Sequence, residues 1–476
     1  MRRLFACIGI LVLFSALFCG CAAREEGTLY RIEGEYDPET GTLSATLDLT
    51  YRNDTGEELD ELAFNLYGNA YREGAKYQPL SAAYHSAYYD KLSYGGMKIA
   101  SVDGAESWEV GGEDENLLVV RTGHIGRGET VRLAIDFSTT LAKVNHRLGI
   151  GETCVNLGNF YPVLCVYDGG WQACNYYNVG DPFYSECASY EVKLTFPKTY
   201  TLASSGREEA VSVQGDKKTV TLRLEHARDF AAVLSDSFSV LQATVNGVQI
   251  SYYYTQDEDA QAHLSLIRES FSYFSEQFGA YPYETLAVAQ TDFCFGGMEY
   301  PALTMINRNL AEESALYTIV HENAHQWWYA AVGNDQINHA WMDEGLAEYA
   351  CVLFFESHDY GYTRSGVVTS ARKAIRAYTG IYSQLFGKTD TAMDRPLSAF
   401  MSEYEYSNLV YNQGILLFDS LREAIGEKRF MSGLQEYYRK YSGKIASPEA
   451  LISCFERTGV DVRGHFSSFL EGNAVI

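Results

Sequence analysis

The chain has 476 residues, a formal net charge of −25, 46% hydrophobic residues and 21% charged residues. This composition indicates well-buried globular domains rather than wholesale disorder, and the length predicts two or three of them at roughly 100–200 residues each. A surface this acidic repels the phosphates of nucleic acids, so we exclude a nucleic-acid partner.

The N-terminus has the layout of a targeting segment. Arg2 and Arg3 precede an almost unbroken apolar run over residues 4–18, which is too short to span a bilayer. Cys21 follows, in a context that resembles a bacterial lipoprotein signal. We therefore expect residues 1–21 to be a signal peptide with cleavage before Cys21, and the exported protein to be lipid-anchored at the extracytoplasmic membrane surface. Ordinary secretion with cleavage nearby is the alternative.

Four cysteines lie close together in the middle of the chain: Cys154, Cys165, Cys174 and Cys187. Their spacing contains no C-x-x-C pair, which argues against a zinc–cysteine site. An exported protein permits a disulfide among them. Buried free thiols are the simpler interpretation, and the sequence does not decide any pairing.

Apolar and polar residues alternate with a period of two along much of the first half. The clearest runs cover residues 43–51, 131–137, 190–196 and 220–224. This period is typical of half-buried strands, and Asn246-Gly247 is a two-residue hairpin signal. We expect an N-terminal antiparallel all-β domain over residues 25–254.

The pattern becomes helical near residue 255. Apolar residues recur at three- and four-residue spacing over 264–278, and Gly279 follows as a helix end. A short strand over 285–293 comes next, and helical patterns dominate from Ala311 onward. We expect residues 255–476 to form a second, mostly α-helical domain.

His321, Glu322 and His325 belong to an H-E-x-x-H sequence. Positions i and i+4 share one face of a helix, so the two imidazoles converge on one metal ion. Glu322 lies beside them and is placed to act as a general base. The motif alone has a competing interpretation, which is a pair of ordinary histidines.

A second helical segment supplies a third metal ligand. Eighteen residues, 326–343, separate His325 from Glu344, which is the gluzincin spacing. Two histidine nitrogens and one carboxylate oxygen are the ligands of a catalytic zinc site with its fourth position open. Glu348, one turn further on, is either an outer partner that orients a histidine ring or an exposed helix charge.

Further segments resemble those of the membrane-alanyl-aminopeptidase family of zinc peptidases. Residues 296–300 are similar to its G-x-M-E-N motif, 332–334 to its V-G-N segment, and 411–414 to its Y-x-K-G segment. Similarity extends into the first half at 158–162 and 180–185. The resemblance implies a thermolysin-like catalytic domain with one Zn²⁺ per chain, held by the two histidines and Glu344.

The resemblance also implies roles in substrate binding. Glu299 would bind the free α-amine of a peptide, while Gly296, Gly297 and Met298 would line the substrate backbone. Tyr411 would stabilise the oxyanion of the tetrahedral intermediate. The family also draws an acidic or amide residue from the first domain into the amine site, and no match assigns that residue here.

The implied function is a zinc aminopeptidase that hydrolyses the N-terminal peptide bond. Two departures from the family motifs, Tyr300 in place of Asn and Gln413 in place of Lys, leave amino-terminal selectivity open. A zinc endopeptidase or oligopeptidase is the first alternative, and a non-catalytic surface binding protein is the second. The sequence does not reveal the preferred N-terminal side chain, the physiological substrate or the oligomeric state.

Overall fold

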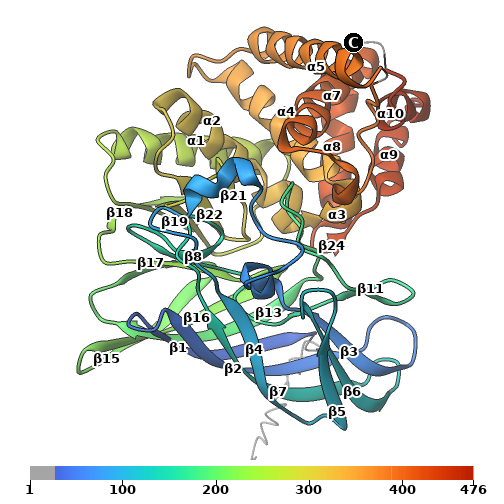
Figure 1. Cartoon of the computed structure of the whole chain (residues 1–476). Coiled ribbons are helices and arrows are strands. Elements are labelled where there is room, and N and C mark those ends of the chain that lie inside the picture. The colour runs from blue at the N-terminus through green and yellow to red at the C-terminus, as the bar shows by residue number, and fades with distance from the viewer. Residues whose placement is uncertain (1–26, 388, 475–476) are drawn as a thin grey trace, which may run out of the picture.

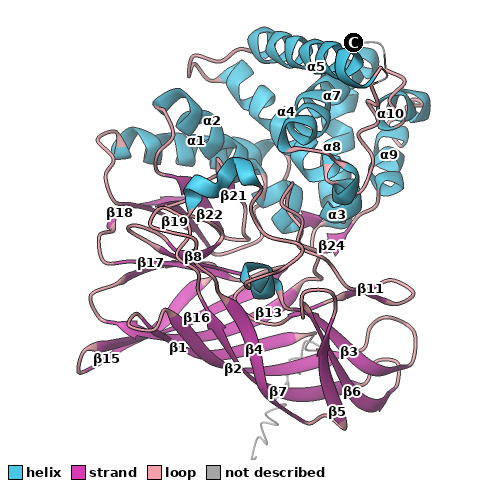
Figure 2. Ribbon diagram, viewed as in Figure 1, coloured by secondary structure: helices cyan, strands magenta, loops and turns pink. Residues whose placement is uncertain are grey.

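The computed structural model describes residues 27–387 and 389–474. The predicted signal peptide and Cys21 lie outside these residues. Strands gather at one end of the molecule and helices at the other, as Figures 1 and 2 show. The predicted fold class, an antiparallel β-rich domain followed by a mostly helical one, is confirmed. Within the described residues, no helix is both long and apolar enough to cross a membrane.

The largest sheet has seven strands in the order β15-β16-β13-β1-β2-β7-β4. Their bounds in chain order are β1 (Leu29–Asp37), β2 (Thr42–Arg52), β4 (Gly96–Asp103), β7 (Thr130–Thr140), β13 (Ala188–Pro197), β15 (Arg207–Gln214) and β16 (Lys217–Ala227). All four predicted alternating runs lie in this sheet. One pair departs from the antiparallel expectation, because β1 runs parallel to β13.

Smaller sheets pack against this one and share its core. One has the order β10-β3-β6-β5, formed by β3 (Leu59–Asn65), β5 (Ser107–Gly111), β6 (Leu117–Ile125) and β10 (Val163–Leu164). Another has the order β14-β17-β9-β8, formed by β8 (Leu148–Ile150), β9 (Val155–Gly158), β14 (Thr201–Ser204) and β17 (Ala231–Ser235). A ribbon pairs β11 (Val166–Tyr167) with β12 (Trp171–Gln172), and short 3-10 helices cover 67–71 and 82–87.

A five-stranded mixed sheet lies under the first two helices, in the order β18-β19-β20-β22-β21. Its strands are β18 (Ser239–Val245), β19 (Val248–Tyr254), β20 (Thr285–Thr291), β21 (Gly297–Met298) and β22 (Leu303–Asn307). The predicted hairpin at Asn246-Gly247 joins β18 to β19, and both turn residues have positive φ. This sheet therefore crosses the boundary expected between residues 254 and 255.

The helices follow from α1 onward. They are α1 (Ala260–Gln277), α2 (Glu312–Ala324), α3 (Gln336–His339), α4 (Trp341–Ser357), α5 (Arg364–Phe386), α6 (Glu403–Tyr406), α7 (Gln413–Ile425), α8 (Glu427–Tyr441), α9 (Pro448–Glu456) and α10 (Arg463–Leu470). Two π-helical segments cover 326–331 and 407–412, a 3-10 turn covers 397–399, and β23 (Val332–Gly333) pairs with β24 (Lys444–Ile445). Helix α4 is buried along almost its whole length, so it forms the centre of this half.

The four clustered cysteines are free thiols in the structure. Cys154, Cys165 and Cys174 are buried, and Cys187 is partly exposed. Burial raises the pKa of Cys174 to about 12, so this thiol stays protonated at neutral pH.

Helices α4 and α7 cross where a glycine of each meets a glycine of the other. A Cβ added at Gly414 would lie 2.7 Å from the Cα of Gly345, which no packed structure tolerates without movement. Gly345 directly follows Glu344, and Gly414 lies three residues after Tyr411. The close crossing therefore explains the glycine of the Tyr411-x-x-Gly414 segment, because it brings Tyr411 next to Glu344.

We predict that Gly414→Ala lowers the free energy of unfolding by about 1–3 kcal/mol, the usual cost of overpacking a tight contact. Urea denaturation of the variant and the wild type measures this. Gly380→Ala is the matched control, because Gly380 lies within α5 and its added Cβ would meet nothing within 4 Å. That variant should be neutral or more stable by up to about 1 kcal/mol. Equal stability of Gly414→Ala and wild type would contradict the close-crossing explanation.

Candidate active site

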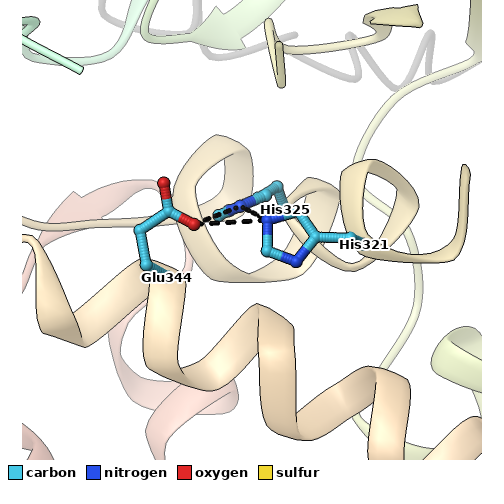
Figure 3. Close-up of side chains that lie close together, drawn as sticks. All are labelled: His321, His325 and Glu344. Atoms are coloured by element: carbon cyan, nitrogen blue, oxygen red, sulfur yellow. Dashed lines mark hydrogen bonds and ion pairs between the residues drawn. The ribbon is translucent and has the colours of Figure 1, made fainter. Parts of the chain in front are cut away.

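His321, His325 and Glu344 meet between the end of α2 and the start of α4. His321 Nε2 lies 3.0 Å from His325 Nε2 and 3.2 Å from Glu344 Oε2, and His325 Nε2 lies 3.3 Å from the same oxygen. Figure 3 shows the carboxylate on one helix facing both rings on the other. All three side chains are buried.

The triangle of donor atoms has the dimensions of a tetrahedral zinc site. Zinc–nitrogen and zinc–oxygen bonds of about 2.0–2.2 Å at tetrahedral angles place neighbouring donors about 3.3 Å apart. Glu344 Oε2 is also buried without a hydrogen-bond donor among the described residues, which is costly unless a cation satisfies it. The donor set and its spacing therefore fit Zn²⁺.

The outer nitrogens of the two histidines lie close to oxygen atoms. His325 Nδ1 lies 3.0 Å from the backbone oxygen of Trp328, and His321 Nδ1 lies 3.3 Å from Glu348 Oε1. The other oxygen of Glu348 accepts a hydrogen bond of 2.6 Å from the Tyr317 hydroxyl. Glu348 is buried, so the structure favours the orienting role over the exposed helix charge. Such contacts hold the rings with Nε2 free for a metal.

Glu322 lies against the backbone of Gly297, in the segment that is predicted to bind substrate. A Cβ added at Gly297 would lie 2.4 Å from Glu322 Oε1, so this position requires glycine. Glu322 Oε2 is buried and has no hydrogen-bond partner among the described residues. Burial raises the pKa of this carboxyl to about 8, while His321 opposes the shift. When this carboxyl is ionised, its unpaired oxygen can accept a proton from water.

Tyr411 donates a hydrogen bond of 2.6 Å from its hydroxyl to Glu344 Oε1. Its ring stacks beside that of His321, with the ring centroids 5.8 Å apart. Burial raises the pKa of this phenol well above its usual value, so the group keeps its proton and remains a donor. The structure thus brings Tyr411 next to the metal-binding triangle.

Gly297 and Met298 form β21, the edge strand of the five-stranded sheet, and Gly296 directly precedes it. An edge strand leaves backbone groups free to pair with an extended peptide. The two glycines line the site cavity, whereas the Met298 side chain is fully buried and faces Arg147. Only the backbone of Met298 is therefore placed to contact substrate.

Glu299 is buried, and it accepts a hydrogen bond of 3.1 Å from Gln336 Nε2. The same amide donates at 2.6 Å to Asp343, which also accepts from Asn334. Carboxylate oxygens of Glu299, Glu344 and Asp181 all lie within 4.8 Å of one another. Burial raises the pKa of Glu299 to about 7, and the charge of Asp181 adds to the shift.

Asp181 is the residue that the sequence analysis did not assign. It belongs to the segment between β12 and β13, so the β-rich half contributes a carboxylate beside Glu299. The signal that could have found it is modest: Asp181 is the single acidic residue of the 180–185 segment. Its proximity to Glu299 is a tertiary contact that no local pattern encodes.

The two departures from the family motifs point away from the cavity. The Tyr300 hydroxyl donates to Asn159 Oδ1 at 2.9 Å, and its ring is fully buried against Gly158. Gln413 donates to the backbone oxygens of Thr391 and Phe469 at 2.9 and 3.3 Å. Neither side chain lines the cavity beside the metal-binding residues.

A cavity of about 440 Å³ lies beside Asp181, His321, Glu322 and Tyr411, and it can hold a few residues of a peptide. Side chains from both halves of the chain line it, among them Tyr84, Arg147, Asp181, Glu322, Glu403, Tyr406 and Tyr411.

We predict that Glu348→Gln weakens zinc affinity by about 10–100-fold, the usual effect of losing an outer partner of a metal-bound histidine. Competition against a fluorescent zinc chelator measures the affinity. Glu356→Gln is the control, because Glu356 lies on the same helix but pairs at the surface with Arg422. Wild-type affinity in Glu348→Gln would show that Glu348 does not support the metal.

Comparisons with known proteins agree with this geometry. Residues 262–469 match the model of the Peptidase family M1 domain. Human endoplasmic reticulum aminopeptidase 1 is 28% identical over 251 residues, which are 46% of this chain and 24% of that protein. Aminopeptidase N of Caulobacter vibrioides is 24% identical over 247 residues, which are 49% of this chain and 28% of that protein. The chain thus matches only about a quarter of the length of these relatives.

A solved structure matches over nearly the whole length. The M1 zinc metallopeptidase of Deinococcus radiodurans has a TM-score of 0.63 and 20% sequence identity, with 95% of each chain covered. The predicted zinc cofactor is confirmed by the family match and the assembled donor triangle. Residues 262–469 therefore match a peptidase family M1 domain, and the chain has the fold of a solved M1 zinc metallopeptidase.

Proposed function

We propose that this protein is a zinc-dependent aminopeptidase that removes N-terminal residues from peptides. The observation that carries the proposal is the pair of carboxylates, Asp181 and Glu299, beside the metal-binding triangle. A peptide α-amine is largely protonated at neutral pH, and two carboxylates are suited to bind it. When the amine is bound there, the first peptide bond of the substrate lies at the metal. Any chain extending beyond the amine would meet buried acidic groups.

The relatives support the same reaction. The human and Caulobacter vibrioides relatives are aminopeptidases. A variant of the Deinococcus radiodurans metallopeptidase was solved bound to a Tyr-ser-ala substrate. We infer that peptides with a free N-terminus are the substrates of this chain.

The roles of the side chains follow from their positions. A zinc ion bound by His321, His325 and Glu344 would act as a Lewis acid and lower the pKa of water. Glu322 would take the proton as the water attacks the scissile carbonyl, and would pass it to the leaving amine. Tyr411 would donate its hydrogen bond to the oxyanion, where preorganised donors are most effective.

The edge of β21 would hold the peptide in an extended conformation. Backbone pairing with this strand fixes the register of the substrate relative to Glu322, because Gly297 lies against that carboxylate.

The two alternative functions, an endopeptidase and a non-catalytic binding protein, gain less support. An endopeptidase would need space beyond the amine site, and a binding protein would not need Glu322 and Tyr411 in these positions.

We predict that Glu322→Gln retains zinc but lowers kcat by about 10²–10⁴-fold, because the amide cannot accept the proton. Aminoacyl-fluorophore hydrolysis and metal analysis measure the two quantities. Glu313→Gln, an exposed change on the same helix, should keep wild-type activity. Retention of more than roughly a tenth of wild-type kcat would rule out the general-base role.

We also propose that the protein acts at the extracytoplasmic membrane surface, anchored through an acylated Cys21. The basic, apolar and cysteine-containing order of residues 1–21 supports this. A fatty-acid probe should label the wild type and Cys19→Ala but not Cys21→Ala. A diacylglyceryl group would supply the two chains that stable anchoring requires. Equal labelling of Cys21→Ala would exclude this anchor.

A further inference from the structure

Arg147 is a cation that lines the cavity beside Asp181. Arg147 directly precedes β8, and its side chain is 7% exposed. Its guanidinium pairs with Asp181 Oδ1 and donates at 3.3 Å to the backbone oxygen of Gly180. It also donates at 3.4 Å to the Tyr176 hydroxyl. These contacts fix three points of the segment that carries Asp181.

The side chain of Arg147 also reaches β21. Arg147 Nε lies 3.0 Å from the sulfur of Met298, the residue before Glu299. The rings of Phe183 and Phe295 lie 5.6 and 5.4 Å from its guanidinium carbon, a distance typical of cation–π contacts. Arg147 is therefore held from several sides, and it contacts both segments that supply the carboxylates.

We propose that Arg147 is the positioning residue of the amine site, setting the orientation of Asp181 and its separation from Glu299. This inference rests on the proposed aminopeptidase function. Arg147 acts through Asp181 and the strand of Met298, because its guanidinium is already paired with Asp181 and with the backbone oxygen of Gly180.

Charge explains why such a residue is needed. Two buried carboxylates as close as Asp181 and Glu299 repel each other when no ligand is bound, and a fixed cation offsets this repulsion. Among the described residues, Arg147 is the one cationic side chain that pairs with Asp181. A buried arginine would also repel a substrate ammonium if no carboxylate neutralised the charge of the arginine.

Asp181 neutralises the charge of Arg147 with one carboxylate oxygen and keeps its other oxygen free as a hydrogen-bond acceptor. Oxygen Oδ1 is used by Arg147, whereas Oδ2 receives no hydrogen bond from the described residues, and Asp181 lines the cavity. One oxygen is therefore anchored and the other is available for an ammonium group. Because a guanidinium fork fixes direction as well as charge, lysine at this position would preserve the charge but not the orientation.

The test compares two zinc-binding inhibitors that differ only in the amine. Leucine hydroxamate carries the α-amine, and 4-methylpentanoyl hydroxamate lacks it. Their dissociation constants are measured on the zinc-loaded full chain by calorimetry. The wild type should bind the amine form at least about tenfold tighter, on the scale of one charged hydrogen bond.

Arg147→Met should lose most of this tenfold preference and keep wild-type affinity for the des-amino compound. Arg147→Lys should recover part of the preference. Asp181→Asn should lose it while leaving Arg147 in place, and the double variant Arg147→Met with Asp181→Asn should lose no more than either single variant.

The outcomes separate the two claims. A wild type that does not distinguish the compounds would overturn the proposed amine site itself. A wild-type preference that persists in Arg147→Met would overturn the positioning role alone. Equal weakening of both compounds in Arg147→Met and Arg147→Lys would assign Arg147 a general structural role and also overturn the inference.

Discussion

Buried negative charge is the constraint on which the site depends. Asp181, Glu299, Glu322, Asp343 and Glu344 are all buried, and several of them lie within a few ångströms of one another. Burial raises the pKa values of Asp181 and Asp343 to about 7, as expected for carboxyls removed from water. Such a cluster keeps its negative charge at neutral pH only when cations offset it.

Each cation that the site requires has a defined place. The donor triangle accommodates a divalent metal, Arg147 pairs with Asp181, and the proposed amine site lies between Asp181 and Glu299. The buried negative charge therefore has two roles. It supplies a ligand to the metal and, under the proposed function, attracts the α-ammonium of a peptide to a neighbouring pair of carboxylates.

The scaffold brings these groups together by close contacts between distant segments. The crossing of α4 and α7 at Gly345 and Gly414 sets Tyr411 beside Glu344. The two halves are joined by the buried Arg228 of the β-rich half. Its guanidinium donates to the backbone oxygens of Tyr329 at 2.8 Å and of Ala331 at 3.4 Å, just after the metal-binding helix. The amine site needs this junction, because one of its carboxylates comes from each half.

Local signals in the sequence predicted the metal centre and much of the fold. The two histidines and Glu322 lie within one helical turn, so spacing alone places them together, and the Asn246-Gly247 turn is equally local. The tertiary contacts were not predictable. Asp181 and Arg147 meet Glu299 and Met298 only through folding, and period-two alternation does not reveal that β1 runs parallel to β13. The inward direction of Tyr300 likewise depends on Gly158, far away in the sequence.

The direction of cleavage tests the central claim most directly. The zinc-loaded protein is incubated with a decapeptide in its free and N-acetylated forms, and the products are followed over time by mass spectrometry. An amine site built from Asp181 and Glu299 predicts stepwise loss of single N-terminal residues from the free peptide and little cleavage of the acetylated one. Internal fragments, or equal cleavage of both forms, would contradict it.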